Sequence, residues 1–262
     1  MKAIILAAGQ GTRMGKYTEN LPKGMLNFNG KTLLEWQLNT LRENGIEDIS
    51  IVTGYKREAI KYEGLKYYHN PNFAITNMVE TLLCARNELK GDILVAYSDI
   101  FYTTQLIEKI VKTPGDIVVA VDSAWRDYWM MRYGTTEFDL ETLSVQNGKI
   151  VDLGIEIDSS KGIDYRYIGL IKFAEHSWEQ VLKLYDEKKA RKECWSSSGK
   201  NFPNGFMTDL LNELIQLGVE VLPCVTEREW LEFDTESDYE IVLKNFKSGA
   251  LTHLFETKNK LL

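Results

Sequence analysis

The chain has 262 residues, of which 44% are hydrophobic and 26% are charged. This is the composition of an ordinary folded protein, and the length suffices for a large α/β domain with a substantial core. The formal net charge is −7 and no block is rich in Lys or Arg. We therefore expect no nucleic-acid partner, because binding to a phosphate backbone needs a cationic surface.

Cysteine usage and hydropathy favour a cytoplasmic protein. Cys84, Cys194 and Cys224 are an odd number without a CxxC pair, which is typical of free thiols in a reducing compartment. The apolar stretch 1–8 is too short for a signal peptide, and no apolar run approaches the length of a membrane-spanning helix. We expect no membrane, no disulfide framework and no zinc site.

Short apolar runs alternate with helical patterns over the first 121 residues. The predicted strands are 2–7, 49–53, 93–97 and 117–121. The predicted helices begin at Thr32, where Glu35 completes a capping box, and at Asn77, running to about Leu89, and a third spans 104–112. This order predicts a Rossmann-like, doubly wound, mostly parallel mixed sheet. Ligands of such a sheet bind at the carboxyl ends of the strands.

The pattern changes after residue 121. Residues 142–146 and 149–153, joined by Asn147-Gly148, predict a β-hairpin, and we interpret 122–165 as an inserted lid. The remaining predicted elements are strand 166–173, helices 175–189 and 206–217, strands 219–224 and 230–233, and a helix from Thr235.

No linker separates two domains, so we expect one domain over 1–247 and a helical tail over 248–262. Leu251, Leu254 and Phe255 in this tail are spaced as on one helix face. A homodimer contact and ordinary core packing explain this spacing equally well.

The most informative stretch is 6–14, Leu-Ala-Ala-Gly-Gln-Gly-Thr-Arg-Met, followed by Pro22-Lys23. Two glycines after a buried strand let backbone N–H groups approach a polyphosphate, and Arg13 and Lys23 add positive charge. The stretch therefore predicts an anion-binding loop.

Two common phosphate-binding signatures do not fit this loop. A Walker A loop needs four residues between its glycines, whereas five separate Gly9 from Gly15, and Tyr17 follows the lysine where Ser or Thr is required. A dinucleotide fingerprint needs a glycine where Met14 stands and an acidic residue at the end of the second strand, where Thr53 stands.

The pattern Leu-x-x-Gly-x-Gly-Thr-Arg-Met followed by Pro-Lys closely resembles the signature of the sugar-phosphate and phosphocholine nucleotidyltransferase family. The resemblance extends over most of the chain and is strongest in the first hundred residues. It implies transfer of a nucleoside monophosphate from an NTP to a phosphorylated acceptor, with release of pyrophosphate. By this resemblance Gly9, Gly11 and Thr12 would hold the NTP phosphates, Arg13 would contact the pyrophosphate, and Lys23 would bridge the α-phosphate and the acceptor.

The resemblance also implies a Mg²⁺ site. Asp99 follows a predicted strand at the sheet edge that carries the glycine loop, and Asp234 stands where the family places its second metal ligand. Two carboxylates suffice, because phosphate oxygens and water complete the Mg²⁺ octahedron. Glu232 is the substitute candidate for Asp234. His69 and the other two histidines are expected to be structural, since an acceptor phosphate is already anionic at neutral pH.

In the family the base is read by backbone near Ala8 and by the segment that here includes Thr76, Asn77 and Thr81. Asn77 is equally well explained as a helix N-cap. The Asn-rich stretch around these residues resembles the cytidylyltransferase branch acting on phosphocholine and phosphonates. This favours CTP as the donor.

Trp125, Trp129, Arg132 and Tyr167 are the candidates for binding the acceptor. Aromatic faces can bind an amine, and arginine can bind a phosphonate or carboxylate. An ordinary lid over the pocket explains the aromatic residues and arginines of this insert equally well. Two rival functions stay open: a hexose-1-phosphate uridylyl- or thymidylyltransferase, and a catalytically silent nucleotide-binding module.

Overall fold

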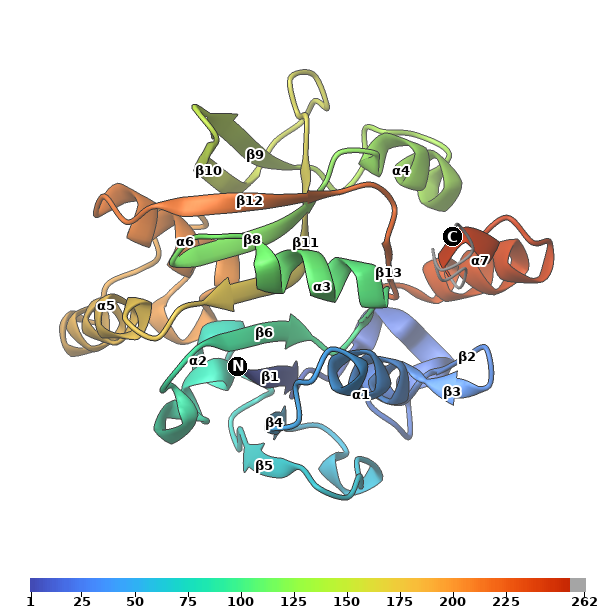
Figure 1. Ribbon diagram of the computed structural model, residues 1–262, viewed down its shortest axis with the longest axis horizontal. Coiled ribbons are helices and arrows are strands. Elements are labelled where there is room, and N and C mark those ends of the chain that lie inside the picture. Colours follow the sequence, from blue (N-terminus) through green and yellow to red (C-terminus); the bar gives the residue numbers. More distant parts are fainter. Residues whose placement is uncertain (255–262) are drawn as a thin grey trace.

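The computed structural model describes residues 1–254, and its centre is a seven-stranded sheet in the order β12-β8-β11-β6-β1-β4-β5 (Figure 1). The strands are β1 Lys2–Ala7, β4 Ile49–Thr53, β5 Lys66–His69, β6 Ile93–Tyr97, β8 Ile117–Asp122, β11 Arg166–Phe173 and β12 Val221–Thr226. Neighbouring strands are parallel except β11, which runs antiparallel to both β6 and β8. The predicted mostly parallel mixed sheet is confirmed.

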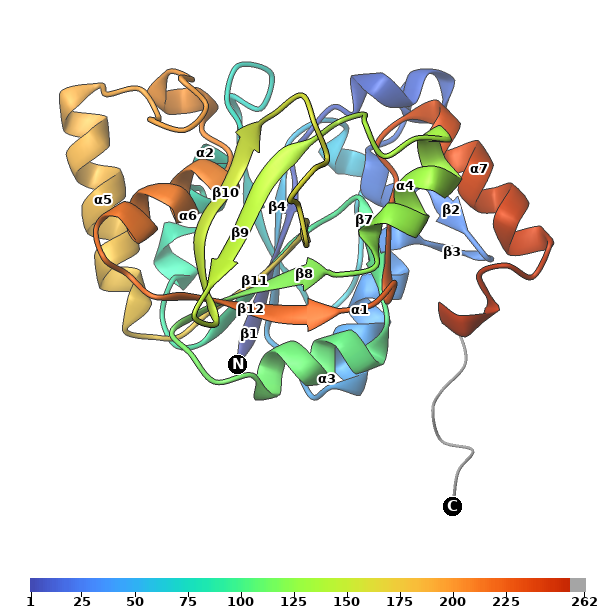
Figure 2. The ribbon, with the colours of Figure 1, turned by 90° about the horizontal axis from the view of Figure 1, so that it is seen from above.

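Helices cover both faces of this sheet (Figure 2). They are α1 Leu33–Glu43, α2 Met78–Leu83, α3 Thr104–Lys112, α4 Trp125–Tyr133, α5 Ser177–Arg191, α6 Met207–Gln216 and α7 Glu236–Lys247. Because strand residues alternate between faces, Ala3 and Ile5 of β1 pack in the core under α1 and α3, whereas Ile4 and Leu6 pack in the core under α2, α5 and α6. Both faces of β1 are thus buried, as its apolar run predicts.

The predicted helix starts are confirmed at α1 and α2. Thr32 and Glu35 form the capping box of α1, and the side chain of Asn77 accepts a hydrogen bond from the backbone of Met78 at the start of α2. Helix α2 is shorter than predicted. It ends at Leu83 and a 3₁₀ turn, Arg86–Glu88, follows, because the backbone of Ala85 leaves the helical conformation (φ −97°, ψ 24°).

The segment 122–165 contains both the predicted hairpin and an unpredicted helix. Strands β9 (Glu141–Gln146) and β10 (Lys149–Glu156) pair antiparallel, and Asn147 and Gly148 both have positive φ, as their hairpin turn requires. Helix α4 precedes the hairpin. Its buried side chains, Trp125, Tyr128, Trp129 and Arg132, follow the i, i+3, i+4, i+7 spacing of one helix face.

Two small sheets complete the fold. Strand β7 (Ile100–Tyr102) pairs antiparallel with β13 (Trp230–Glu232), and β2 (Asn27–Phe28) pairs with β3 (Lys31–Thr32). Leu251 and Leu254 are buried in the core shared with α1 and α3, so core packing accounts for them, and Phe255 lies outside the described residues. None of the described helices is long and apolar enough to cross a bilayer.

Candidate active site

A cavity of about 300 Å³ opens at the carboxyl ends of β1 and β6. The predicted nucleotide, catalytic and metal residues all line it: Ala8, Gly9, Gly11, Thr12, Arg13, Lys23, Thr76, Asn77, Thr81, Asp99 and Asp234. They converge because β1 and β6 are parallel neighbours, so that the loops after Ala7 and Tyr97 leave the sheet at the same edge.

The glycine loop is shaped by contact with Lys23. Gly11 has φ 65°, a left-handed conformation that disfavours other residues. A Cβ at Gly11 would lie 2.6 Å from Cγ of Lys23, so the lysine stem passes directly over this glycine. The carbonyl of Gly11 accepts a hydrogen bond of 2.8 Å from the Thr18 hydroxyl. The loop and Lys23 therefore form one packed unit.

Asp99 and Asp234 are brought together by the β7–β13 ladder. Strand β7 begins directly after Asp99, Glu232 of β13 pairs with Ile100, and the backbone N–H of Phe233 donates to the carbonyl of Asp99 at 2.9 Å. An antiparallel pair that starts after one aspartate and ends just before the other must place the two side by side.

Both carboxylates contact the ammonium of Lys23. Its Nζ lies 3.1 Å from Oδ2 of Asp99 and 2.7 Å from Oδ1 of Asp234, and Nη1 of Arg13 lies 2.7 Å from the other oxygen of Asp234. Burial alone would lower the pKa of Lys23, but the two aspartates outweigh burial and the pKa is raised. Lys23 is therefore a permanent cation at neutral pH.

The same arrangement fits a divalent cation. Two carboxylates that already converge on one positive charge have the donor chemistry that Mg²⁺ prefers. Residues 1–254 contain no group of three or more His, Cys, Asp or Glu side chains suited to a metal ion. Asp99 and Asp234 are the side chains that would hold it, together with oxygens of a bound triphosphate.

At the other end of the cavity, Asn70 organises two hydroxyl groups. Its buried amide donates to Oγ1 of Thr76 at 2.9 Å and to Oγ1 of Thr81 at 3.0 Å. Each hydroxyl donates its own hydrogen to a backbone carbonyl, that of Asn72 or Asn77. A hydroxyl has one donor and two acceptor sites, so each keeps one accepting site for a ligand.

A second cavity of about 380 Å³ adjoins the first. Both are lined by Arg13, Tyr97, Glu232 and Asp234. The rest of the second cavity is rich in carboxylates from the segment 122–165, Asp139, Glu141 and Glu156, with Arg166 and Tyr167 from β11. Arg166 offsets part of this charge, since it lies 3.4 Å from Asp139 and 4.0 Å from Glu141. The remaining negative charge favours a ligand that carries a cationic or hydrogen-bond-donating group beside its anionic end.

The family model of the MobA-like NTP transferase domain matches residues 3–192, which covers both the glycine loop and Asp99. The chain belongs to this family. It is accordingly a nucleotidyltransferase, and the resemblance inferred from the glycine loop is confirmed.

The chain is similar in sequence to two relatives and in fold to one solved structure. The CTP:phosphoglutamine cytidylyltransferase of Campylobacter jejuni is 31% identical over 255 residues, which cover 93% of this chain and 100% of the relative. The choline-phosphate cytidylyltransferase of Streptococcus pneumoniae is 33% identical over 51% of this chain and 59% of the relative. The structure of the CTP:phosphocholine cytidylyltransferase from Streptococcus pneumoniae aligns with a TM-score of 0.75 at 22% identity, over 94% of this chain and 98% of that one, and shows the shared fold.

Three of the four residues predicted to contact the acceptor of this nucleotidyltransferase are placed elsewhere. Trp125 and Trp129 are buried in the core, the side chain of Arg132 is 0% exposed, and none of the three lines either cavity. Trp129 packs edge-on against Trp125 and Tyr128 of the same helix, and Arg132 pairs with Asp238 of α7. These contacts correct the prediction that the three residues touch the acceptor. Tyr167 does line the second cavity.

Other lining residues were not predicted. Phe73 lies beside Thr76 in the first cavity and packs edge-on against Tyr55, while Glu141 and Arg166 face the second cavity. Arg166 stands next to Tyr167 at the start of a predicted strand, a signal that could have identified it. Nδ1 of His69 donates to the backbone carbonyl of Thr53 at 3.2 Å, and His69 lines neither cavity.

His176 lines neither of these cavities. His176 is an exposed side chain 2.7 Å from Asp116, and the side chain of His253 lies outside the described part of the structure. The three cysteines, Cys84, Cys194 and Cys224, are free, as predicted.

Proposed function

We propose that this nucleotidyltransferase transfers CMP from CTP to a small phosphorylated or phosphonate acceptor and releases pyrophosphate. The observation that carries the proposal is the junction of the two cavities at Arg13, Glu232 and Asp234, with Lys23 beside it. A donor in the first cavity and an acceptor in the second would meet at these charges. Both enzyme relatives described above are named as cytidylyltransferases, which supports CTP.

The donor's triphosphate would lie along the glycine loop. Backbone N–H groups near Gly9 and Gly11 and the cations of Arg13 and Lys23 offset its negative charge. Mg²⁺, held by Asp99 and Asp234, would neutralise further phosphate charge when bound. Lys23 would then be free to turn from the aspartates toward the α-phosphate.

The transfer itself is an in-line displacement. An oxygen of the acceptor's phosphate forms a bond to the α-phosphorus of CTP while the bond from that phosphorus to the bridging oxygen of pyrophosphate breaks. The acceptor's second pKa of about 6 makes it dianionic at neutral pH, so no general base is required. The chain's task is to align the two phosphates and to stabilise the charge of the departing pyrophosphate.

The end of the first cavity at Thr76 and Thr81 would favour binding of cytosine over uracil. Thr76 and Thr81 present accepting oxygens, because their hydrogens are committed to backbone carbonyls. The exocyclic amine of cytosine donates to such an oxygen, whereas the corresponding carbonyl of uracil would face it with a second lone pair. Adenine also carries an amine, so ATP belongs among the test donors.

The acceptor would occupy the second cavity, walled by the insert 122–165. The carboxylates of Asp139, Glu141 and Glu156 favour an acceptor with an amine or amide at the end away from its phosphate. Phosphocholine, aminoalkylphosphonates and phosphorylated amides have this character. The cytoplasmic location and the homodimer stay predictions.

The test is an acceptor screen. The protein is incubated with Mg²⁺, each NTP in turn and a panel of phosphocholine, aminoalkylphosphonates, phosphorylated amides and hexose 1-phosphates. Pyrophosphate release is measured and the product is identified by mass. We expect a CMP-linked product from CTP with an amine- or amide-bearing acceptor. A preference for UTP or dTTP with a hexose 1-phosphate would overturn the proposal, and binding of nucleotides without any turnover would favour a silent module.

A further inference from the structure

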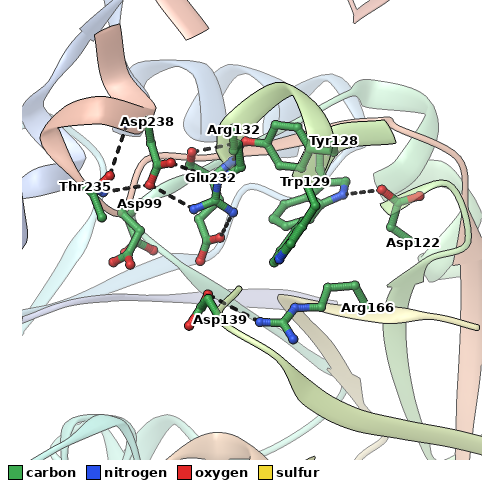
Figure 3. A network of polar contacts seen from close by, with 12 residues as sticks. Asp99, Asp122, Tyr128, Trp129, Arg132, Asp139, Arg166, Glu232, Thr235 and Asp238 are labelled. Atoms are coloured by element: carbon green, nitrogen blue, oxygen red, sulfur yellow. Dashed lines mark hydrogen bonds and ion pairs between the residues drawn. The ribbon is translucent and has the colours of Figure 1, made fainter. Parts of the chain in front are cut away.

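Arg132 of α4 is a fully buried cation with three charge-assisted hydrogen bonds. Its Nε and Nη2 donate to the two oxygens of Asp238 at 3.0 and 2.9 Å, and its Nη1 donates to Oε2 of Glu232 at 2.5 Å (Figure 3). The side chains of Arg132 and Asp238 are both 0% exposed. A buried guanidinium is tolerated only where carboxylates meet its charge in fixed geometry, so these three side chains form a rigid unit.

The two carboxylates bound by Arg132 flank Asp234 in the sequence. Glu232 ends β13 just before Asp234, and Asp238 lies in the first turn of α7 just after it. Asp238 also accepts from the backbone N–H of Thr235 at 2.9 Å, while its own N–H donates to the Thr235 hydroxyl at 3.1 Å. Arg132 therefore holds both ends of the short segment that carries Asp234.

Helix α4 holds the same segment at a second point. The hydroxyl of Tyr128, one turn before Arg132, donates to the carbonyl of Glu232 at 3.2 Å and accepts from its N–H at 2.8 Å. Both the backbone and the side chain of Glu232 are thus fixed by α4. Glu232 lines both cavities. The contacts with α4 therefore fix a residue at the place where donor and acceptor would meet.

We propose that Arg132 is a positioning residue for nucleotidyl transfer: it holds Asp234 opposite Asp99 and Lys23 and directs Glu232 to the junction of the two cavities. The inference rests on the proposed function for its kinetic readout. Residues that orient metal-binding carboxylates from behind are typically worth about 10- to 100-fold in metal affinity or activity. Helix α4 belongs to the segment 122–165, which also lines the second cavity. The wall of that cavity and the segment that carries Asp234 are therefore joined through the hydrogen bonds of α4.

The experiment compares Arg132→Met with Lys188→Met. Lys188 forms a buried pair with Glu213 at 2.7 Å, with side chains 7% and 10% exposed, and lines neither cavity. Both variants lose the cation of a buried pair, and both are expected to melt at lower temperature. Only Arg132→Met is expected to reduce kcat for CMP transfer, per folded molecule, by about 10- to 100-fold.

A binding measurement separates positioning from stability. Isothermal titration of CTP is carried out with and without Mg²⁺, at a temperature where each variant is folded. In wild type and Lys188→Met we expect Mg²⁺ to increase the affinity for CTP. In Arg132→Met we expect the ratio of CTP affinities with and without Mg²⁺ to be about tenfold smaller. If Arg132→Met does not fold, Asp238→Asn releases one end of the segment while Arg132 keeps Glu232, and a smaller loss of the same kind is expected.

These measurements distinguish failure of the inference about Arg132 from failure of the proposed function. If wild type transfers CMP and Arg132→Met matches it in kcat and in the Mg²⁺ gain, Arg132 is only a stabilising residue and the inference is overturned. If wild type transfers no CMP at all, the proposed function fails. The Mg²⁺-dependent CTP titration then still decides whether Arg132 positions Asp234.

Discussion

The carboxylates of Asp99 and Asp234 contact the same atom, Nζ of Lys23, at 3.1 and 2.7 Å. These two acids are far apart in the sequence, and they meet there because each adjoins one strand of the β7–β13 ladder. Two negative charges that converge on one atom repel each other, and a cation between them offsets this repulsion. Under the proposed function, a divalent cation delivered with the triphosphate would take the place of the lysine between these carboxylates.

Asp99→Asn is expected to lower kcat by roughly a hundredfold or more while the protein stays folded. Asparagine keeps the size and can still accept a hydrogen bond from Lys23, but it supplies no negative charge to a divalent cation. Pyrophosphate release and thermal melting measure the two effects. Asp186→Asn, which removes a surface pair with Arg86, is the control and should leave both unchanged. Normal turnover in Asp99→Asn would remove this carboxylate from the mechanism.

Gly11→Ala is expected to lower kcat by about ten- to hundredfold and raise KM for CTP, since a Cβ there displaces the stem of Lys23. It also costs about 1–2 kcal/mol of stability, because φ is 65°. Gly30→Ala is the matched control: φ is 82°, but no atom lies within 4 Å of its added Cβ. It should cost similar stability without a kinetic effect. Equal kinetics in both variants would contradict the contact with Lys23.

Thr81→Val is expected to weaken the preference for CTP over UTP. Valine keeps the shape but removes the accepting oxygen, a hydrogen bond worth about 1 kcal/mol, or about fivefold in kcat/KM for CTP. Thr81→Ser retains the oxygen and should retain the preference. The measurement is kcat/KM for both nucleotides with one acceptor. An unchanged ratio in Thr81→Val would mean that the base is read elsewhere.

The residues that line the first cavity could be predicted from sequence because many of them are local in the chain. Gly9, Gly11 and Arg13 are adjacent in the chain, and the end of a parallel strand fixes where they point. The position of Asp99 could be predicted for the same reason, because it follows the parallel strand β6. Pairing of Asp234 with Asp99 needs the β7–β13 contact, which joins distant segments, and no local pattern specifies such a contact.

The residues that line the second cavity were predicted less well, and α4 shows why. Trp125, Tyr128, Trp129 and Arg132 have the spacing of a buried helix face, yet aromatic rings with an arginine also resemble a ligand pocket. The helical spacing predicts the burial of these side chains correctly. A buried arginine needs carboxylate partners, and those of Arg132 stand at positions 232 and 238, which sequence alone does not bring near it. Glu141 of β9 and Arg166 of β11 reach the second cavity only through the tertiary fold, which local sequence does not specify.

The pair of Arg132 and Asp238 predicts how stability depends on pH. Burial acts to raise the pKa of Asp238, but the hydrogen bonds and charge of Arg132 outweigh it and the pKa is lowered. The unfolded chain, with an ordinary aspartate pKa of about 3.9, therefore binds this proton more readily than the folded protein. The contribution of the pair to the free energy of unfolding is fully present above about pH 5 and is lost as pH falls through the lowered pKa.

Asp238→Asn isolates this contribution. At pH 7 it should reduce the free energy of unfolding by about 3 kcal/mol, because Arg132 keeps its charge while half of its partners are gone. The difference between wild type and variant should shrink as pH falls below about 4, where wild type begins to lose the same interaction. Urea unfolding of both proteins from pH 3 to 7 measures it, and other carboxylates cancel because they titrate in both. Parallel curves over this range would show that Asp238 does not carry the pH dependence, and that the carboxyl is not held ionised by Arg132.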